Sequence, residues 1–238
     1  TVNAGGALTD SGTVSITGAT TISASGQNIT LDETASTFGT LSLTGANVAV
    51  TENAATDLGA STVSGTLDIT SAGAVTDSGT LAITGATAIS ASGQNITLDE
   101  TASTFGTLSL TGANVAVTEN AATDLGASTV SGTLGITSAG AITNSGSLAI
   151  TGDATFDNSG GSDDAITLNN SSNSFTGTVT FTTDSGSTVT IVDTTALDLA
   201  ALTAGSLSVT AGGDISDSGV LDIGTTASFT TTAANGNV

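Results

Sequence analysis

Hydrophobic and polar residues alternate with a period of two along most of the chain. Leu81 and Ile83, for example, alternate with Ala82 and Thr84, so successive side chains point to opposite faces. Such runs last four or five residues and end at Ser-Gly, Thr-Gly or Asn, which is typical of short strands. No stretch has apolar residues at helical spacing, and the abundant Thr, Ser and Gly are poor helix formers. The pattern predicts an all-β chain.

One long segment occurs twice without change. Ser23–Leu67 returns letter for letter as Ser90–Leu134, an offset of 67 in the numbering. Motifs of the form Gly-Thr-Leu-x-Ile-Thr recur as well, and they begin at Gly12, Gly39, Gly65, Gly79, Gly106, Gly132 and Gly146. Self-similarity at a fixed period indicates an array of structural repeats. We therefore expect a single repeat region over 1–238, with units 1–67, 68–134, 135–205 and a partial unit 206–238.

The third unit is longer than the first two. Phe38 and Phe105 are separated by the same offset of 67, whereas Phe175 lies 70 beyond Phe105. The difference predicts an insertion of about three residues. The segment Asp157–Asp164 is rich in Gly, Ser and Asp, and we expect it to form a turn that bulges outward.

Strands follow one another too closely for helical crossovers. About nine short strands fit between Leu67 and Val130, which leaves either hairpins or a parallel β-helix. Hairpin loops favour Asn-Gly or Asp-Gly, and the one Asn-Gly, Asn235-Gly236, lies outside the repeats. An unchanged copy would also bring identical side chains close together if the units stack along one axis. We predict a parallel β-helix with about three short strands and about 22 residues per coil.

Stacking explains how such a chain would be held together. One coil cannot bury its own apolar face, so the coils above and below must cover it. Inward Leu, Ile, Val and Phe would form apolar columns, and outward Thr and Ser would form hydroxyl rows. Four asparagines flank the expected strands and suit ladders of stacked amides at the turns: Asn28, Asn47, Asn95 and Asn114.

The charge of the chain excludes several classes of partner. It has no Lys, Arg or His and 21 acidic residues, for a formal net charge of −21. No internal salt bridge between side chains can form, so cohesion must come from apolar packing and hydrogen bonds. Nucleic acids and anionic membrane surfaces repel such a chain, and no apolar run approaches the roughly 20 residues that span a bilayer. We expect no nucleic-acid partner and no membrane insertion.

Other missing residues bear on origin and location. Without Cys, disulfides and thiolate metal sites are excluded. The absence of Met and of a signal-peptide pattern indicates a processed chain or an excerpt of a longer one. Without Lys or Arg, trypsin-like proteases have no site to cut, which suits an extracellular protein.

Candidate chemistry is confined to carboxylates and hydroxyls, because the usual catalytic bases and nucleophiles are missing. Asp32-Glu33 and Asp99-Glu100 are the densest acids of the repeats, and Asp163-Asp164 is a similar pair. Such pairs suit calcium, whose ligands are oxygens, or they form solvated turns. Glycoside hydrolysis requires two acids about 5 to 10 Å apart in a cleft, and a repeated surface offers no unique cleft. We assign no catalytic, cofactor-binding or metal-binding residue and expect no enzymatic activity, with calcium as the one possible cofactor.

Two further sets of residues have a structural and a functional interpretation. Phe38, Phe105 and Phe175 share one phase of the repeat, where they either fill the core or present platforms on which sugars stack. Three triplets match the N-glycosylation pattern, which also arises by chance in a chain rich in Asn, Ser and Thr: Asn28-Ile29-Thr30, Asn95-Ile96-Thr97 and Asn169-Asn170-Ser171.

Several stretches resemble a known group of bacterial proteins. Gly205–Gly219 (GSLSVTAGGDISDSG), Asn173–Phe181 (NSFTGTVTF) and Leu134–Gly152 are similar to the repeats of filamentous-haemagglutinin-like exoproteins, the large secreted adhesins of two-partner secretion. The resemblance covers most of the chain and lies in its degenerate repeats. It implies a right-handed parallel β-helix shaft that is exported through an outer-membrane partner and used in attachment or biofilm. The amino-terminal secretion domain of those proteins is not visible in this sequence, and a total lack of Lys and Arg is extreme for that group.

These observations leave more than one function open. The first is a structural extracellular shaft of a bacterial surface adhesin, or a self-assembling filament, whose partners are copies of itself, adjoining β-helix repeats or environmental glycans. The second is a ligand-binding repeat surface that uses its hydroxyl rows to bind calcium, glycans or ice. A carboxylate-based glycosidase is the third.

Overall fold

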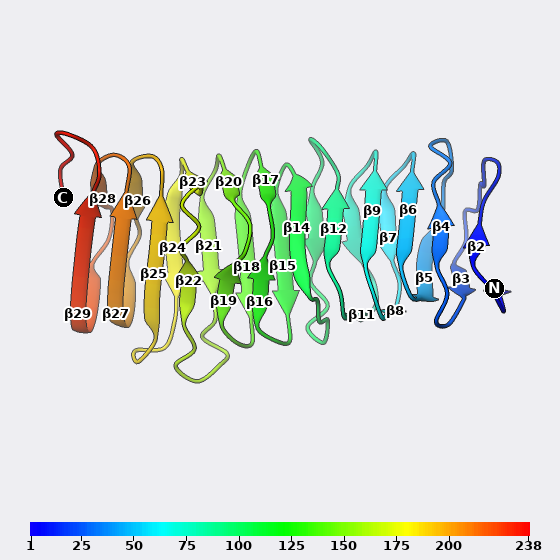
Figure 1. Ribbon diagram of the computed structural model, residues 1–238, viewed down its shortest axis with the longest axis horizontal. Coiled ribbons are helices and arrows are strands. Elements are labelled where there is room, and N and C mark those ends of the chain that lie inside the picture. Colours follow the sequence, from blue (N-terminus) through cyan, green and yellow to red (C-terminus); the bar gives the residue numbers. More distant parts are fainter. The chain divides into compact units, whose positions relative to one another are not determined.

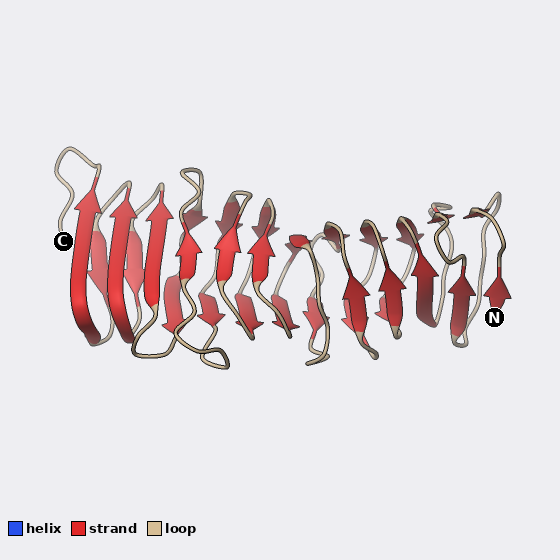
Figure 2. Cartoon of the chain, turned by 60° about the horizontal axis from the view of Figure 1, so that its bottom comes forward, coloured by secondary structure: helices blue, strands red, loops and turns tan.

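The computed structural model describes the whole chain, residues 1–238, and contains strands and turns but no helix (Figure 2). The chain divides into two compact units, Thr1–Glu119 and Asn120–Val238, and these boundaries do not follow those of the sequence repeats. Within each unit, strands stack in parallel from turn to turn. The predicted all-β parallel solenoid is therefore confirmed in both units. The structure has no helix that is long and apolar enough to span a membrane.

Unit 1 consists of two parallel sheets between which the chain alternates (Figure 1). The β1 sheet contains β1 (Val2–Asn3), β3 (Thr20–Ser23), β5 (Thr40–Gly45), β7 (Thr56–Leu58), β10 (Val75–Asp77), β13 (Ile96–Leu98) and β15 (Val115–Glu119), with β8 (Ser61–Val63) and β11 (Leu81–Ile83) beside the main path. The β2 sheet contains β2 (Leu8–Thr9), β4 (Ile29–Leu31), β6 (Val48–Glu52), β9 (Leu67–Ser71), β12 (Thr87–Ser90) and β14 (Thr107–Gly112).

Unit 2 has the same plan. The β16 sheet contains β16 (Thr123–Leu125), β19 (Ile142–Asn144), β22 (Ile166–Leu168), β25 (Thr188–Asp193), β27 (Leu202–Ala211) and β29 (Leu221–Thr231), and β17 (Ser128–Val130), β20 (Leu148–Ile150) and β23 (Ser174–Phe175) pair with one another beside it. The β18 sheet contains β18 (Leu134–Ser138), β21 (Ala154–Asp157), β24 (Thr178–Thr182), β26 (Leu197–Leu199) and β28 (Ile215–Asp217).

The turns are smaller than the sequence predicts. Val50 pairs with Ile69, Ile69 with Ile89, and Ile89 with Leu110. Successive partners are thus offset by 19, 20 and 21 in the numbering, and a turn of unit 1 is shorter than the predicted coil. Each turn has two main strands, and some turns add a short third one, such as β8 or β11, so the predicted number of about three strands applies to those turns.

The sequence repeat does not contain a whole number of turns. β3 belongs to the β1 sheet, but its repeat copy β12 belongs to the β2 sheet, and the path between them changes sheet seven times. The repeat is therefore seven half-turns, which is three and a half turns. Identical side chains consequently lie on opposite sheets instead of close together, as the copies β4 and β13 also show.

The core lies between the two sheets and consists of columns of inward side chains. Val50, Ile69, Ile89 and Leu110 occupy successive turns of one column and are each at most 2 % exposed. Burial of a side chain of this size contributes about 1.5 to 3 kcal/mol. Each turn therefore depends on its neighbours for most of its stability, as in other repeat proteins.

The glycine that begins the recurrent motif is required where successive turns touch. A Cβ atom on Gly39 would lie 2.7 Å from the carbonyl oxygens of both Thr17 and Gly18. In the Ser-Gly-Gln turns, Gly26 and Gly93 adopt φ angles of +71° and +75°, a region that side chains disfavour.

The insertion predicted for the third repeat is confirmed. The loop between β12 and β13 covers residues 91–95, whereas the loop at the same phase between β21 and β22 covers residues 158–165. The longer loop raises the offset between Ile142 and its partner Ile166 to 24 in the numbering. The insertion changes the corner and leaves the flanking strands in register.

Candidate functional site

The acidic pairs that the sequence singles out lie at corners that follow β4 and β13. The main-chain N–H of Asp32 donates to Asp10 Oδ1 at 3.1 Å, and that of Asp99 donates to Asp77 Oδ1 at 2.9 Å. In each case an acid of one turn holds the main chain of the next. The carboxylates of Asp10 and Asp77 therefore serve as corner anchors.

The pKa of Asp77 is raised, and burial is the largest cause. Hydrogen bonds from the N–H groups of Asp99 and Glu100 lower the pKa, and the negative charges of these two side chains raise it. No group of three or more acidic side chains in the structure is arranged to hold a metal ion. The pairs Asp32-Glu33 and Asp99-Glu100 follow strands of different sheets, so they do not converge on a common cleft.

The acids of the insertion occupy the outward loop between β21 and β22. Asp163 has a φ angle of 55°, and its N–H donates to Asp184 Oδ2 at 3.4 Å. The carbonyl of Asp164 accepts a hydrogen bond from Asn158 Nδ2 at 2.8 Å. These two hydrogen bonds hold the main chain of the loop in place.

The phenylalanines of the repeat belong to the core. Phe38 and Phe105 are each 7 % exposed and Phe175 is 1 % exposed. Phe156 packs edge-on against Phe175 with ring centroids 6.1 Å apart and stacks on Phe181 at 5.8 Å. The core interpretation is confirmed, and these rings cannot serve as sugar platforms.

Sequence reasoning missed a second use of acids, which is to anchor these phenylalanines. The main-chain N–H of Phe38 donates to Glu52 Oε1 at 2.7 Å, and that of Phe105 donates to Glu119 Oε1 at 2.7 Å. Glu52 Oε2 also accepts from Thr56 Oγ1 at 2.9 Å. The available signal was an acid at an inward position at the end of the second strand after each phenylalanine, at the same offset in both repeats.

The third repeat keeps this contact with a shorter acid. Asp193 is 2 % exposed, and its Oδ1 accepts from the N–H of Phe175 at 3.2 Å. Burial is the main cause that raises the pKa of both Glu52 and Asp193, and hydrogen bonds to main-chain N–H groups oppose it. These carboxylates therefore hold protons more tightly in the folded chain than in the unfolded one.

The predicted asparagine ladders are present. Asn47 Nδ2 donates to Asn28 Oδ1 at 3.1 Å, and Asn114 Nδ2 donates to Asn95 Oδ1 at 3.0 Å. The first residues of two glycosylation triplets are thus ladder members, and Asn170 of the third triplet accepts the N–H of Ser172 at 3.0 Å. The acceptor asparagines of the first two triplets, Asn28 and Asn95, therefore have a structural use.

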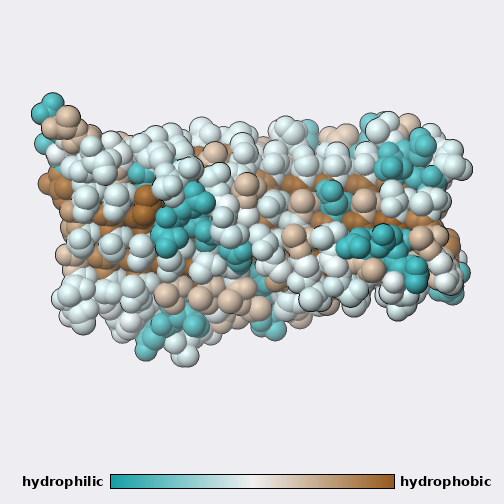
Figure 3. Space-filling model, in the orientation of Figure 1, coloured by the Kyte–Doolittle hydropathy of each residue, from teal (hydrophilic) through white to brown (hydrophobic).

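The outward face of the β16 sheet carries a regular hydroxyl array. Beyond the register shift between Ala204 and Ser206 of β27, three rows run across β25, β27 and β29. Eight of their nine members carry a hydroxyl, and the ninth is Val192: Thr188, Ser206 and Thr226, then Thr190, Ser208 and Ser228, then Val192, Thr210 and Thr230. Within a row the spacing is that of neighbouring strands, about 4.8 Å. No row contains an acid, and the surface over these strands shows neutral atoms with apolar atoms between them (Figure 3).

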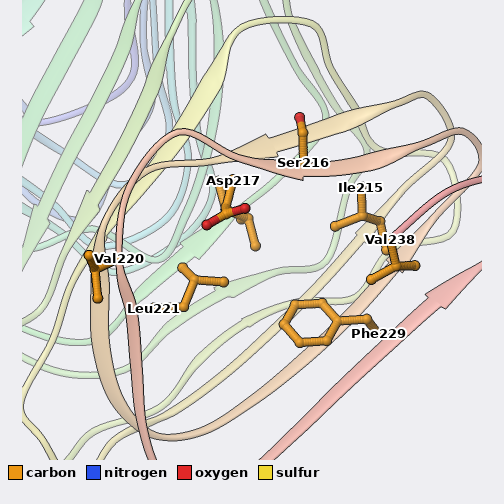
Figure 4. A pocket seen from close by; sticks show the side chains of 8 residues that line it. Ile215, Ser216, Asp217, Val220, Leu221, Phe229 and Val238 are labelled. Atoms are coloured by element: carbon orange, nitrogen blue, oxygen red, sulfur yellow. The ribbon is translucent and has the colours of Figure 1, made fainter.

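Two hollows lie at uncovered turns, one in each unit. In unit 2 a hollow of about 480 Å³ is lined mainly by apolar side chains, with Phe229, Leu221 and Val238 around its floor (Figure 4). In unit 1 a hollow of about 320 Å³ is lined by side chains that include Val14, Ile16 and Phe38. Both hollows expose apolar side chains of the kind that fill the core in other turns.

A known family of repeats matches almost all of the chain. Four consecutive segments, residues 1–44, 45–111, 112–182 and 186–238, match a family described as "Repeats of unknown function (DUF5649)". No curated protein and no solved structure matches the chain. The segment 45–111 has the same length as the repeat read from the sequence.

Proposed function

The chain belongs to this family of repeats of unknown function, and from that premise we propose that it is a structural shaft. It extends an adhesin or a filament away from a bacterial surface, outside the cell. Its partners are adjoining solenoid repeats or further copies of itself, and environmental glycans are contacted at the surface of the assembly.

The observation that carries this proposal is the use made of polar side chains. Amides, hydroxyls and carboxylates bridge one turn to the next, as Asn47 does to Asn28, Glu52 to Phe38 and Asp77 to Asp99. The carboxylates of Glu52 and Asp77 are thus occupied in holding turns together. Such a chain suits a mechanical role, in which the number of turns matters more than any one site.

Composition supports the extracellular location. The chain offers no Lys or Arg for trypsin-like proteases, and its stacked strands leave few loops long enough to be cut. Its charge of −21 keeps it soluble and away from anionic surfaces. An epitope inserted in the outward loop 158–165 would be labelled by antibody on intact native cells, and labelling only after the cells are broken would contradict this location.

The shaft is tested by changing its length. A surface anchor, the chain and a reporter binding domain are fused, and one or two further copies of residues 23–89 are inserted. We expect the binding distance to lengthen with each copy while the affinity of the reporter stays constant. A matched control inserts the same residues in scrambled order. Equal reach for the repeat and the scrambled insert would contradict the shaft.

The hydroxyl array favours a second candidate, a ligand-binding repeat surface. An uncharged, regularly spaced array over β25, β27 and β29 suits a ligand that is itself a lattice, such as ice or a crystalline glycan. Inhibition of ice recrystallisation by the chain, and its loss in Thr190→Asp but not in Thr21→Asp, would support this role. Calcium, the third ligand considered, is tested by thermal melting with and without the ion.

A further inference from the structure

The hydroxyl array of unit 2 departs from the way in which hydroxyls serve the opposite sheet. In the β18 sheet, Thr178 Oγ1 donates across to Asp198 Oδ2 of the next turn at 2.8 Å. Within the array, Ser206 and Thr188 share one hydrogen bond at 3.1 Å. The side chains of the other six hydroxyl residues make no hydrogen bond within the protein. Their donors and acceptors are therefore free to bind a ligand.

The array is ordered in two directions. Six successive residues of β25 pair with Ser206–Ala211 of β27, and the same six residues of β27 pair with Thr226–Thr231 of β29 (Figure 1). Neighbouring strands lie about 4.8 Å apart, and alternate residues of one strand lie about 6.6 Å apart. The hydroxyls therefore form a two-dimensional grid on one face of unit 2.

The middle row of the grid continues beyond these three strands. Thr190 pairs with Thr167 of β22, and Thr167 pairs with Thr143 of β19. Thr143 in turn pairs with Asp124 of β16, where the row of hydroxyls ends. Five hydroxyls thus follow one another across the sheet: Thr143, Thr167, Thr190, Ser208 and Ser228.

The side chains of the array favour a ligand that is neutral and rigid. The array contains no acid, although the chain carries a charge of −21. Threonine is stiff at χ1 because it is branched at Cβ, so its hydroxyl is held in place before a ligand arrives and little entropy is lost on binding. One hydroxyl contributes little by itself. Many hydroxyls act together when the ligand repeats as the array does.

Ice fits these properties better than a crystalline glycan does. Sugar rings have apolar faces, and sites for organic molecules are lined mainly by hydrophobic and aromatic side chains. This chain has no Trp or Tyr, and unit 2 buries Phe156, Phe175 and Phe181 in its core. Ice presents only oxygen atoms, which donate or accept hydrogen bonds and repeat in two directions on each crystal face. The array offers matching groups and lacks what a sugar would require.

We propose that the hydroxyl array binds the surface of ice. Its hydroxyls hold a layer of water molecules in the grooves of the grid, and this layer joins the crystal face through water-mediated hydrogen bonds. A chain bound in this way blocks the addition of further water at the place that it covers. The inference rests on the second candidate function above, the ligand-binding repeat surface, and names its ligand.

The proposal is tested with the whole chain by growing ice slowly from a dilute solution and measuring the fraction of protein taken into the ice. We expect uptake of the unaltered chain well above that of an inert protein of the same size. Thr190→Asp and Ser208→Asp should each lower the affinity for ice by about tenfold or more, because a charge placed against an uncharged lattice loses water without gaining a partner.

Thr180→Asp is the matched control. Thr180 is a half-buried outward residue of β24, as Thr190 is of β25, but it lies in the opposite sheet of the same unit. All three substitutions add the same charge, and circular dichroism would verify that each variant keeps its fold. Thr180→Asp should enter ice as the unaltered chain does.

Uptake of the unaltered chain no greater than that of the inert protein would overturn the proposal, and so would an equal loss in Thr180→Asp and Thr190→Asp. Sedimentation with microcrystalline cellulose distinguishes the alternative ligand. Binding to cellulose that is lost in Thr190→Asp, without uptake into ice, would overturn ice as the ligand and keep the ligand-binding surface. Failure of both assays with a normal length dependence in the anchored fusion would remove the array as a binding site and leave the shaft intact.

Discussion

At the scale of single residues, this chain buries carboxylates without any basic side chain to neutralise them. With no Lys, Arg or His, the positive partners at hand are N–H and O–H dipoles. Glu52 receives the N–H of Phe38 and the hydroxyl of Thr56, and Asp193 receives the N–H groups of Phe175 and Thr195. Buried charges normally require such partners, so these acids are fixed by the main chain around them.

The first prediction concerns Glu52. Glu52→Ala leaves the buried N–H of Phe38 without its acceptor, and an unsatisfied buried donor costs about 1 to 3 kcal/mol. We expect the free energy of unfolding, measured by urea denaturation and circular dichroism, to fall by that amount. Glu52→Gln keeps an acceptor oxygen and should cost less.

Glu33→Ala is the matched control, because Glu33 sits at a partly exposed corner and its side chain makes no hydrogen bond that the fold requires. It should leave stability within about 0.5 kcal/mol of the parent. If Glu33→Ala and Glu52→Ala lowered the free energy of unfolding equally, the hydrogen bond between Phe38 and Glu52 would not contribute the stability predicted for it.

At the scale of the elements, the half-turn is the unit of construction. Each half-turn consists of a main strand and a corner, and some half-turns add a short strand such as β8 in the same sheet. Inward and outward positions alternate in the same way in both sheets, as β3 and its copy β12 show. A strand sequence therefore fits either sheet. Because a repeat has an odd number of half-turns, each copy of a strand lies in the other sheet, and β3 and β12 keep the same burial pattern there.

This exchange predicts which deletions the fold tolerates. Removing residues 23–89 joins Ile22 to Ser90 and recreates the original sequence across the junction, since Ser90–Leu134 is identical to Ser23–Leu67. Seven half-turns disappear and every remaining strand keeps a neighbour in register. We expect the shortened chain to keep the melting temperature of the parent within a few degrees, as measured by calorimetry.

The control removes residues 23–84, a slightly shorter deletion that brings a corner to a strand position. Inward apolar side chains would then meet solvent-facing positions, because a shift of register changes the face on which side chains lie. This variant should melt earlier and be cut sooner by thermolysin. Equal stability of both deletions would contradict the half-turn rule.

At the scale of the whole molecule, stability depends on an uncompensated charge of −21. Repulsion among like charges opposes the compact state. Burial adds to this effect by raising the pKa values of Glu52, Asp77 and Asp193 above their ordinary values of 4.5, 3.8 and 3.8. Proteins whose carboxylates are paired in the folded state lose stability in acid. In this chain, charge repulsion and the burial of carboxylates both favour higher stability in acid.

We therefore predict that mild acid stabilises the fold. A raised folded pKa means that the folded chain binds more protons than the unfolded chain between the ordinary value and the raised one. The contribution of these three acids is thus fully present below pH 4 or so and is lost as the pH rises through the raised values. Calorimetric melting temperatures should rise from pH 7 toward pH 4.5, and a fall over that range would contradict the prediction.

Salt distinguishes the contribution of charge repulsion to the pH dependence from the contribution of the buried acids. Screening weakens repulsion between exposed charges and acts little on buried groups. The pH dependence should therefore shrink in molar salt without vanishing, and the Glu52→Gln variant should show a smaller part of what remains.

The sequence by itself determined the features that local periodicity encodes. Alternation of Leu81 and Ile83 with the smaller residues Ala82 and Thr84 predicted strands, the exact copy predicted stacking, and the run DNSGGSDD predicted the enlarged corner. The burial of Phe38 and the ladder from Asn28 to Asn47 follow from the same stacking. Each depends on a few neighbouring residues and on the rule that one turn covers the next.

Tertiary structure alone decided how many strands close a turn. β8 and β11 alternate like any other strand, yet they lie beside the main path of their sheet, so a turn is shorter than three full strands would make it and a repeat takes seven half-turns. The contact of Glu52 follows from that closure, because the completed turn brings the N–H of Phe38 to the carboxylate of Glu52. Alternation is a property of one strand, whereas closure of a turn depends on contacts between neighbouring turns, such as that of Ile69 with Ile89.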